Sequence, residues 1–177
     1  MSKRIALLTA AAFGALALIA AIVAPVSAQE KTVMVGGAAM FPSKNIIQNA
    51  VNSKDHTTLV AAVKAAGLVD TLEGKGPFTV FAPTNAAFGK LPAGTVDTLV
   101  KPENKATLTR ILTYHVVPGK LEAFDLSDGK RLKTVEGEEL TVKKADGKAT
   151  IVDAKGGTST VTISNVNQSN GVIHVVD

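Results

Sequence analysis

Residues 76–88 read GPFTVFAPTNAAF, and residues 170–177 read NGVIHVVD. Each segment contains a short run of aromatic and β-branched residues, FTVF at 78–81 and VIHVV at 172–176, which is typical of buried β-strands. Gly76, Pro77 and Pro83 bound the first run and Gly171 precedes the second, and each run is too short to be a helix. The sequence therefore predicts two short buried strands that are separated by about half of the chain.

The region between residue 45 and the second half of the chain has a helical pattern. From Asn45 onward, apolar residues recur at helical spacing. Asp55 is the expected N-cap of the first long helix, and Gly67 is its expected C-cap. Thr84 is expected to cap a short helix, and Pro102 fits the first position of a further helix. This part of the chain is therefore predicted to be mainly helical.

The second half of the chain has the pattern of an antiparallel sheet. Asp-Gly and Asn-Gly pairs at 128, 146 and 170 are hairpin signals because these residues tolerate positive φ angles. Several runs between these turns alternate apolar and polar residues, as strands with one buried face do. Helices followed by strands predict an α+β fold. The expected strands are 132–135, 140–143, 149–152, 159–164 and 172–176, with 78–81 as an early strand.

The first 28 residues have the order of a secretory signal peptide. Lys3 and Arg4 precede the apolar run Ile5–Ala24, and small residues follow up to a cleavage site near Ala28. The alternative is an uncleaved anchor, because about 20 apolar residues can span a bilayer. A membrane contact is expected only through this segment, if it stays uncleaved.

The remaining 149 residues are enough for one domain with its own core. Residues 29–44 lack a clear period and are predicted to be a mobile N-terminal arm, with the domain at 45–177. The absence of cysteine excludes disulfides, thiol catalysis and cysteine-ligated metals. Removing Lys3 and Arg4 from 19 basic residues leaves 17 against 15 acidic ones, so no nucleic-acid partner is expected.

No motif for catalysis, metal binding or cofactor binding is present in the sequence. There is no Gly-x-Ser-x-Gly elbow, no glycine-rich nucleotide loop and no histidine pair with metal-ligand spacing. His115 and His174 each lie in an apolar run, where a neutral imidazole can tie a strand to a neighbouring loop. We therefore expect no catalytic residue, no metal and no cofactor. A hydrolase with a serine beside His115 or His174 is kept as an alternative.

Three segments together resemble a known domain family. Residues 76–88, 170–177 and the Tyr-His stretch YHVVPG at 114–119 are similar to the two signature boxes and the Tyr-His motif of the fasciclin (FAS1) family. The resemblance covers Asn45–Asp177 and implies a small secreted bacterial member. It implies an α+β wedge with a bent antiparallel sheet and a helical layer from the N-terminal half. The implied signature core consists of Phe78, Val80, Phe81, Thr84, Phe88, Gly171, Val172, Ile173 and His174.

The resemblance also implies a function in adhesion. Animal members contact integrins through the Tyr-His motif, which matches Tyr114 and His115 here, and through an Asp-Ile pair, which falls on Asn165 and Val166. Asn165 lacks the carboxylate that an integrin's metal needs, so integrin-type recognition is not expected. What remains is a non-catalytic surface for a cell-surface or extracellular-matrix protein or glycan. The expected location is secreted or periplasmic.

The alternative function is a periplasmic carrier that holds a small apolar ligand between the helices and the sheet. Members of the family usually continue a few apolar residues beyond the second box, so the resemblance implies a short or truncated last strand at Asp177. The sequence defines neither the oligomeric state nor the identity of the partner.

Overall fold

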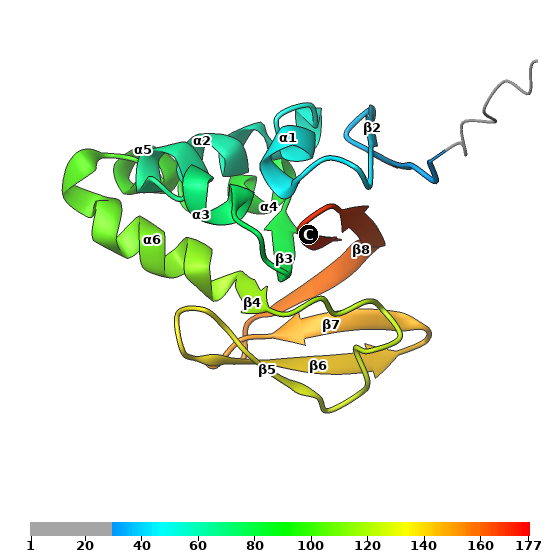
Figure 1. Cartoon of the computed structure of the whole chain (residues 1–177). Coiled ribbons are helices and arrows are strands. Elements are labelled where there is room, and N and C mark those ends of the chain that lie inside the picture. The colour runs from blue at the N-terminus through cyan, green and yellow to red at the C-terminus, as the bar shows by residue number, and fades with distance from the viewer. Residues whose placement is uncertain (1–29) are drawn as a thin grey trace, which may run out of the picture.

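The computed structural model describes residues 30–177, so the predicted signal peptide lies outside the described residues. Helices form one layer of the molecule, and the strands form a strongly bent sheet beneath and beside it (Figure 1). Among residues 30–177, no helix is both long and apolar enough to cross a membrane. The helices are α1 (Ile46–Ala50), η1 (Lys54–His56), α2 (Thr57–Ala66), α3 (Val69–Glu73), α4 (Asn85–Gly89), α5 (Thr95–Leu99), η2 (Pro102–Asn104) and α6 (Lys105–Tyr114). The strands are β1 (Val33–Val35), β2 (Ala38–Met40), β3 (Phe78–Pro83), β4 (Val116–Pro118), β5 (Arg131–Lys133), β6 (Glu139–Ala145), β7 (Lys148–Val152), β8 (Thr158–Gln168) and β9 (Gly171–Val176).

The main sheet has seven strands in the order β4-β3-β9-β8-β7-β6-β5. All neighbours are antiparallel except β3 and β9, which run parallel from Phe78 opposite Gly171 to Pro83 opposite Val176. The predicted α+β wedge is confirmed, but the expectation of a purely antiparallel sheet was wrong at this pair. A hairpin forces antiparallel pairing, whereas the long connection between β3 and β9 leaves the direction open.

The two ends of the sheet approach each other, so the wedge is nearly a barrel. The backbone N–H of Val135, which follows β5, donates to the carbonyl of Val116 in β4 over 2.8 Å. Strand β8 bends the sheet through irregularities in its pairing with β9, between Val161 and Ile163 and between Ile163 and Val166. Bulges of this kind increase local twist. Because of the bend, β9 lies beside the helices, whereas β7 lies in the part of the sheet that is away from them (Figure 1).

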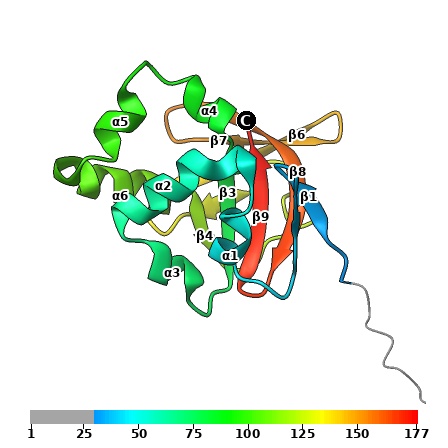
Figure 2. The same cartoon turned by 90° about the horizontal axis from the view of Figure 1, so that it is seen from above.

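Strands β3 and β9 lie side by side at the centre of the molecule (Figure 2). Val80 of β3 and Ile173 of β9 pack toward the helices, whereas Phe81 and Val176 pack into the interior of the bent sheet. Both faces of these strands are therefore buried, which explains why their sequences are almost continuously apolar.

The segment 29–44, which the sequence predicts as a mobile arm, contains a two-stranded hairpin. Strands β1 and β2 pair from Val33 opposite Met40 to Val35 opposite Ala38. The hairpin packs on the core because Val35 and Met40 are both buried among core residues. This hairpin was not predicted from the sequence, since three-residue strands are too short to show a period. The Gly36-Gly37 turn was the available signal, with positive φ at both residues.

The helix boundaries follow local capping interactions. Gly67 ends α2 in the left-handed conformation, as expected, and the Thr84 hydroxyl accepts the Ala87 N–H at the start of α4. Asp55 is not an N-cap, because η1 precedes α2 and contains Asp55 in its first turn. Asn45 instead forms a capping box with Gln48 at α1.

Candidate functional site

The second signature box begins with a buried asparagine that connects three parts of the fold. The side-chain oxygen of Asn170 accepts the Ile46 N–H over 3.1 Å. Its amide nitrogen donates to the carbonyls of Leu72 and Gly74 over 2.7 and 2.8 Å. Asn170 therefore links β9 to α1 and to the end of α3. Sequence reasoning treated this residue only as half of a turn and missed this role.

Gly171, which follows Asn170, is required by the close approach of β3. A Cβ atom at this position would lie only 2.0 Å from the carbonyl oxygen of Phe78. No side chain fits between the two strands there, so the parallel pairing depends on glycine. Of the other residues of the implied signature core, Val80, Phe81, Val172, Ile173 and His174 are buried, whereas Phe78, Thr84 and Phe88 are partly buried.

His174 lies in the middle of β9 and is fully buried. Its Nε2 lies 2.7 Å from the carbonyl oxygen of Leu121, and because a carbonyl only accepts, this nitrogen carries the proton. The ring stacks on Phe81 with centroids 5.6 Å apart. Burial lowers the pKa of His174, and the Leu121 carbonyl and the nearby Glu122 carboxylate oppose this effect. The expected tie between a strand and a loop is therefore found here, as a neutral imidazole that holds the β4–β5 connection.

Thr79 fixes the same connection from β3. Its hydroxyl donates to the Gly119 carbonyl over 2.7 Å and accepts the Leu121 N–H over 2.9 Å. The side chain is fully buried. The neighbouring strands β3 and β9 thus both hold the start of one long loop. The two hydrogen bonds of Thr79 were not predicted from the sequence.

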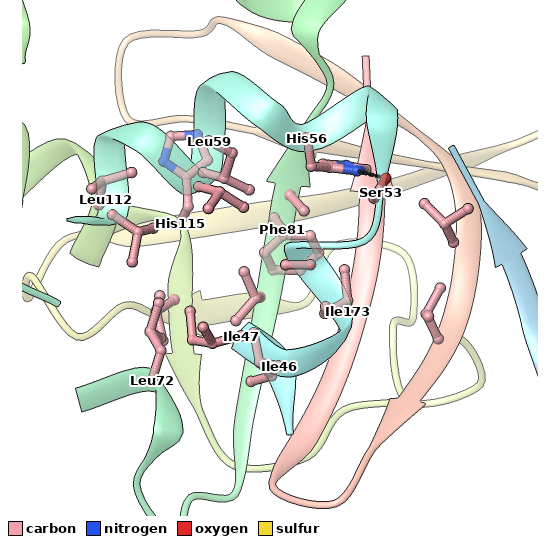
Figure 3. Close-up of a pocket in the computed structure, with 18 of the residues that line it drawn as sticks. Ile46, Ile47, Ser53, His56, Leu59, Leu72, Phe81, Leu112, His115 and Ile173 are labelled. Atoms are coloured by element: carbon pink, nitrogen blue, oxygen red, sulfur yellow. Dashed lines mark hydrogen bonds between the residues drawn. The ribbon is translucent and has the colours of Figure 1, made fainter. Parts of the chain in front are cut away.

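The Tyr-His motif places its two side chains in different environments. His115 ends α6, where its Nδ1 donates to the Ile111 carbonyl over 2.7 Å, and burial lowers its pKa. Its ring lies among apolar side chains such as Leu59 and Leu112 (Figure 3). The Tyr114 hydroxyl instead accepts the Ala154 N–H over 3.0 Å in the β7–β8 turn. Tyr114 is therefore the member of the motif that reaches an open surface.

Asn165 and Val166 also lie in different environments. Asn165 has a φ of 57° at the irregular part of β8, and its side-chain oxygen accepts the Ala123 N–H over 2.7 Å. Val166 is 1% exposed and belongs to the core. Its burial leaves no surface for direct contact with a partner. Among residues 30–177, no hydrogen bond joins this pair to Tyr114 or His115.

A polar cleft of about 360 Å³ lies beside Tyr114, between α6 and the turns before β6 and after β7. Arg110 on its wall forms an ion pair with Glu136, with nitrogen–oxygen distances of 2.8 and 3.1 Å. Burial raises the pKa of Tyr114, and the carboxylates of Asp153, Glu138 and Glu136 add to this effect against the Ala154 N–H. The phenol is therefore protonated at neutral pH. The cleft is lined by Thr107, Arg110, Ile111, Tyr114, Glu136, Glu138, Asp153, Ala154 and Lys155.

A serine and a histidine that the sequence analysis did not single out form a buried pair. The Ser53 hydroxyl lies 2.8 Å from Nδ1 of His56, and the two residues are 2% and 3% exposed (Figure 3). Burial lowers the pKa of His56. A catalytic serine must meet its substrate, and this one is closed off by the core. Within residues 30–177, neither His115 nor His174 has a serine partner, and no cluster of three or more His, Asp or Glu could hold a metal.

A small apolar cavity lies between the helices and β3 and β9 (Figure 3). Its volume is about 50 Å³. An engineered protein cavity that binds benzene measures about 150 Å³. The space is therefore too small for the ligand that the carrier alternative requires. The lining includes Ile46, Ile47, Leu59, Val63, Leu72, Val80, Leu112 and Ile173, with Ser53, His56 and His115 as its polar members.

The nearly closed mixed sheet, with a central parallel pair and a helical layer on one side, is the architecture of a FAS1 domain. The structure is similar to that of a FAS1 domain pair from the insect cell adhesion molecule Fasciclin I, with a TM-score of 0.68. That likeness covers 77% of this chain and 50% of the other, at 20% sequence identity. It confirms the expected fold.

The chain belongs to the fasciclin domain family, whose Fasciclin domain model matches residues 54–177. It is 47% identical to protein sll1483 from Synechocystis sp. over 176 residues, which is 99% of this chain and 94% of that protein. It is also 36% identical over 147 residues to the cell surface glycolipoprotein MPB83 from Mycobacterium bovis, covering 80% of this chain and 62% of that one. The relatives of this chain thus include a surface protein, and its fold occurs in an adhesion molecule.

Proposed function

We propose that this protein is an exported, non-catalytic fasciclin domain that mediates adhesion or another interaction at the cell surface or outside the cell. The observation that carries the proposal is the polar cleft beside Tyr114. The cleft is open, and it holds side chains of both charges on α6 and on the turns before β6 and after β7. The similarity to a cell surface glycolipoprotein and to a domain of a cell adhesion molecule supports the same function.

The chemistry of the cleft suits binding. The Tyr114 hydroxyl accepts one backbone hydrogen bond, and its raised pKa keeps its own proton in place. That proton is available to an acceptor on a ligand. The carboxylate of Glu138 and the ammonium of Lys155 can complement polar groups of a protein or a glycan. Polar groups that converge on an open cleft can orient a partner without a reaction.

The test is retention on the envelope and the extracellular fraction of the producing organism. The paired substitution Glu138→Lys with Lys155→Glu inverts two exposed charges of the cleft without changing the net charge. The matched control, Glu73→Lys with Lys75→Glu, makes the same change at exposed positions near α3. We expect the control to be retained like the wild type and the cleft variant to be released. Equal retention of all three proteins contradicts a role for the cleft.

A further inference from the structure

A second surface of the domain has a different chemistry, and it involves the β4–β5 connection. Phe124 in this loop is 77% exposed. A single exposed aromatic residue is ordinary in itself. The backbone that carries this one is fixed, because both backbone groups of the preceding residue are bonded. The Ala123 N–H donates to Asn165, and the Ala123 carbonyl accepts from the Lys144 ammonium over 3.1 Å.

Further contacts stiffen the same loop on the other side of Phe124. The Asp125 carboxylate accepts the Glu122 N–H over 3.0 Å, and the Lys130 ammonium donates to the Asp125 carbonyl over 2.7 Å. His174 holds Leu121 at the start of the loop. Little freedom of the loop backbone is then left for a ligand to remove when it contacts the exposed ring.

A groove of about 510 Å³ begins at Ala123, next to Phe124. It opens where β8 leaves β7, since the pairing of these strands stops at Thr150 opposite Thr160. Beyond that point β8 turns toward β9 (Figure 1). The hydroxyl-bearing residues Thr160, Thr162 and Ser164 line the groove on the β8 side. The complete lining is Ala123, Leu126, Lys144, Gly147, Lys148, Ala149, Thr160, Val161, Thr162 and Ser164.

The groove is basic. Lys144 and Lys148 line it, and no carboxylate is among the lining residues. Within residues 30–177, neither lysine takes part in an ion pair. Two carboxylates lie close to the groove: Asp128 accepts the Lys144 backbone N–H over 2.8 Å, and Asp177 accepts the Thr160 N–H over 2.7 Å. They lower the positive charge of the groove, but in the part of the chain that the structure describes they form no ion pair with either lysine. The Lys144 ammonium keeps further N–H groups beside its bond to the Ala123 carbonyl, and the Lys148 ammonium has no hydrogen-bond partner among residues 30–177, so both can contact an anionic ligand.

We infer that this groove, together with the exposed Phe124 that follows its lining residue Ala123 in the chain, binds a carboxylated polysaccharide. A sugar ring offers an apolar C–H face for the exposed phenyl ring, hydroxyls for Thr160, Thr162 and Ser164, and, in a uronic acid, a carboxylate for the lysines. Two lysines are too few for nucleic acid, whose binding needs many phosphate contacts. The inference deepens the proposed function by naming a ligand class, at a site that shares no lining residue with the Tyr114 cleft.

The test measures binding of polygalacturonate to the protein purified after expression of the full chain. Neutral dextran, heparin, polyglutamate and duplex DNA are compared with it in the same assay. We expect polygalacturonate to bind most tightly and dextran not at all. Binding weakens as salt rises, because the ammonium–carboxylate contacts are exposed to solvent. Binding of dextran with equal affinity, or stronger binding of heparin, polyglutamate or DNA, overturns the ligand class.

Two variants locate the site. Phe124→Ala is expected to weaken polygalacturonate binding about tenfold, as loss of an exposed aromatic anchor does. Lys148→Gln is expected to weaken it about threefold. The controls are Leu91→Ala, which removes another exposed apolar side chain, and Lys133→Gln, which removes an exposed ammonium on β5. Unchanged binding in both groove variants overturns the site.

The outcome is separable from that of the proposed function. If polygalacturonate fails to bind while the protein is still retained on the envelope, the groove inference is wrong and the proposed function stands. If polygalacturonate binds but the protein is not retained on either fraction, the groove is a binding site and the role in adhesion is wrong.

Discussion

Replacing Asn170 with alanine tests whether one side chain joins β9 to the helical layer. The substitution removes three hydrogen bonds, to the Ile46 N–H and to the carbonyls of Leu72 and Gly74. The residue is 6% exposed, so water does not readily replace these partners. A neutral hydrogen bond contributes about 1 kcal/mol, and a buried group left unpaired costs about 1–3 kcal/mol. The expected loss in the free energy of unfolding is therefore about 3–5 kcal/mol.

A loss of this size is easy to measure, because domains of this kind unfold with about 5–15 kcal/mol. The chain has no tryptophan, so urea unfolding is best followed by far-UV circular dichroism. The matched control is Asn52→Ala, since Asn52 is exposed and donates a single hydrogen bond to the Gln48 carbonyl. The control should lose less than about 0.5 kcal/mol. A loss below about 1 kcal/mol for Asn170→Ala, with an unchanged slope against urea, would refute the reasoning.

Three further predictions concern acid stability, strand packing and processing. The pKa values of all three histidines are lowered by burial, so the unfolded chain binds more protons than the folded one below the ordinary histidine pKa of 6.5. The free energy of unfolding should therefore fall as the pH drops below 6.5, by at most about 1.4 kcal/mol per pH unit for each histidine. Urea midpoints that stay constant between pH 7 and pH 5 would exclude this loss of stability. Gly171→Ala should destabilise the domain by about 1–3 kcal/mol or more, because the added Cβ would meet the Phe78 carbonyl. The control Gly89→Ala has open space around the added Cβ and should not destabilise the domain. Equal melting temperatures for the two variants would contradict the packing argument. Intact-mass measurement of the exported protein should give a chain that begins at Gln29 after cleavage behind Ala28, and detection of only the uncleaved chain in the membrane fraction would instead support the anchor.

Local patterns in the sequence were sufficient to predict most elements of the fold. Apolar spacing and the Gly67 cap predicted α2, and the hairpin signals at 146 and 170 fall at the β6–β7 and β8–β9 turns, whereas the signal at 128 lies in the long β4–β5 connection and joins no hairpin. Local chemistry decides such features, because a cap or a tight turn depends on a few neighbouring residues. The resemblance of three segments to the fasciclin family added the overall architecture.

Features that depend on distant contacts could not be predicted in the same way. Nothing near Asn170 shows that its side chain will meet Ile46, 124 residues away. The parallel direction of β3 and β9 is likewise a property of the assembled sheet. The candidate site was predicted in part: Tyr114 lies at an open cleft, but the burial of Val166 and the contact of Asn165 with Ala123 follow from the irregular course of β8. The role of these residues in binding a partner stays a prediction.

The parallel pairing of β3 and β9 also has a consequence for the order in which the chain can fold. Phe78 pairs with Gly171, so the two central strands cannot meet until almost all of the domain has been synthesised. Pairings between such distant segments form slowly. A partly synthesised chain can form helices and hairpins, but it lacks the strand that covers both halves of the core. Under the proposed export, a chain that crosses a membrane unfolded would complete its core only on the far side, because the last strand to be made is the one that the core requires.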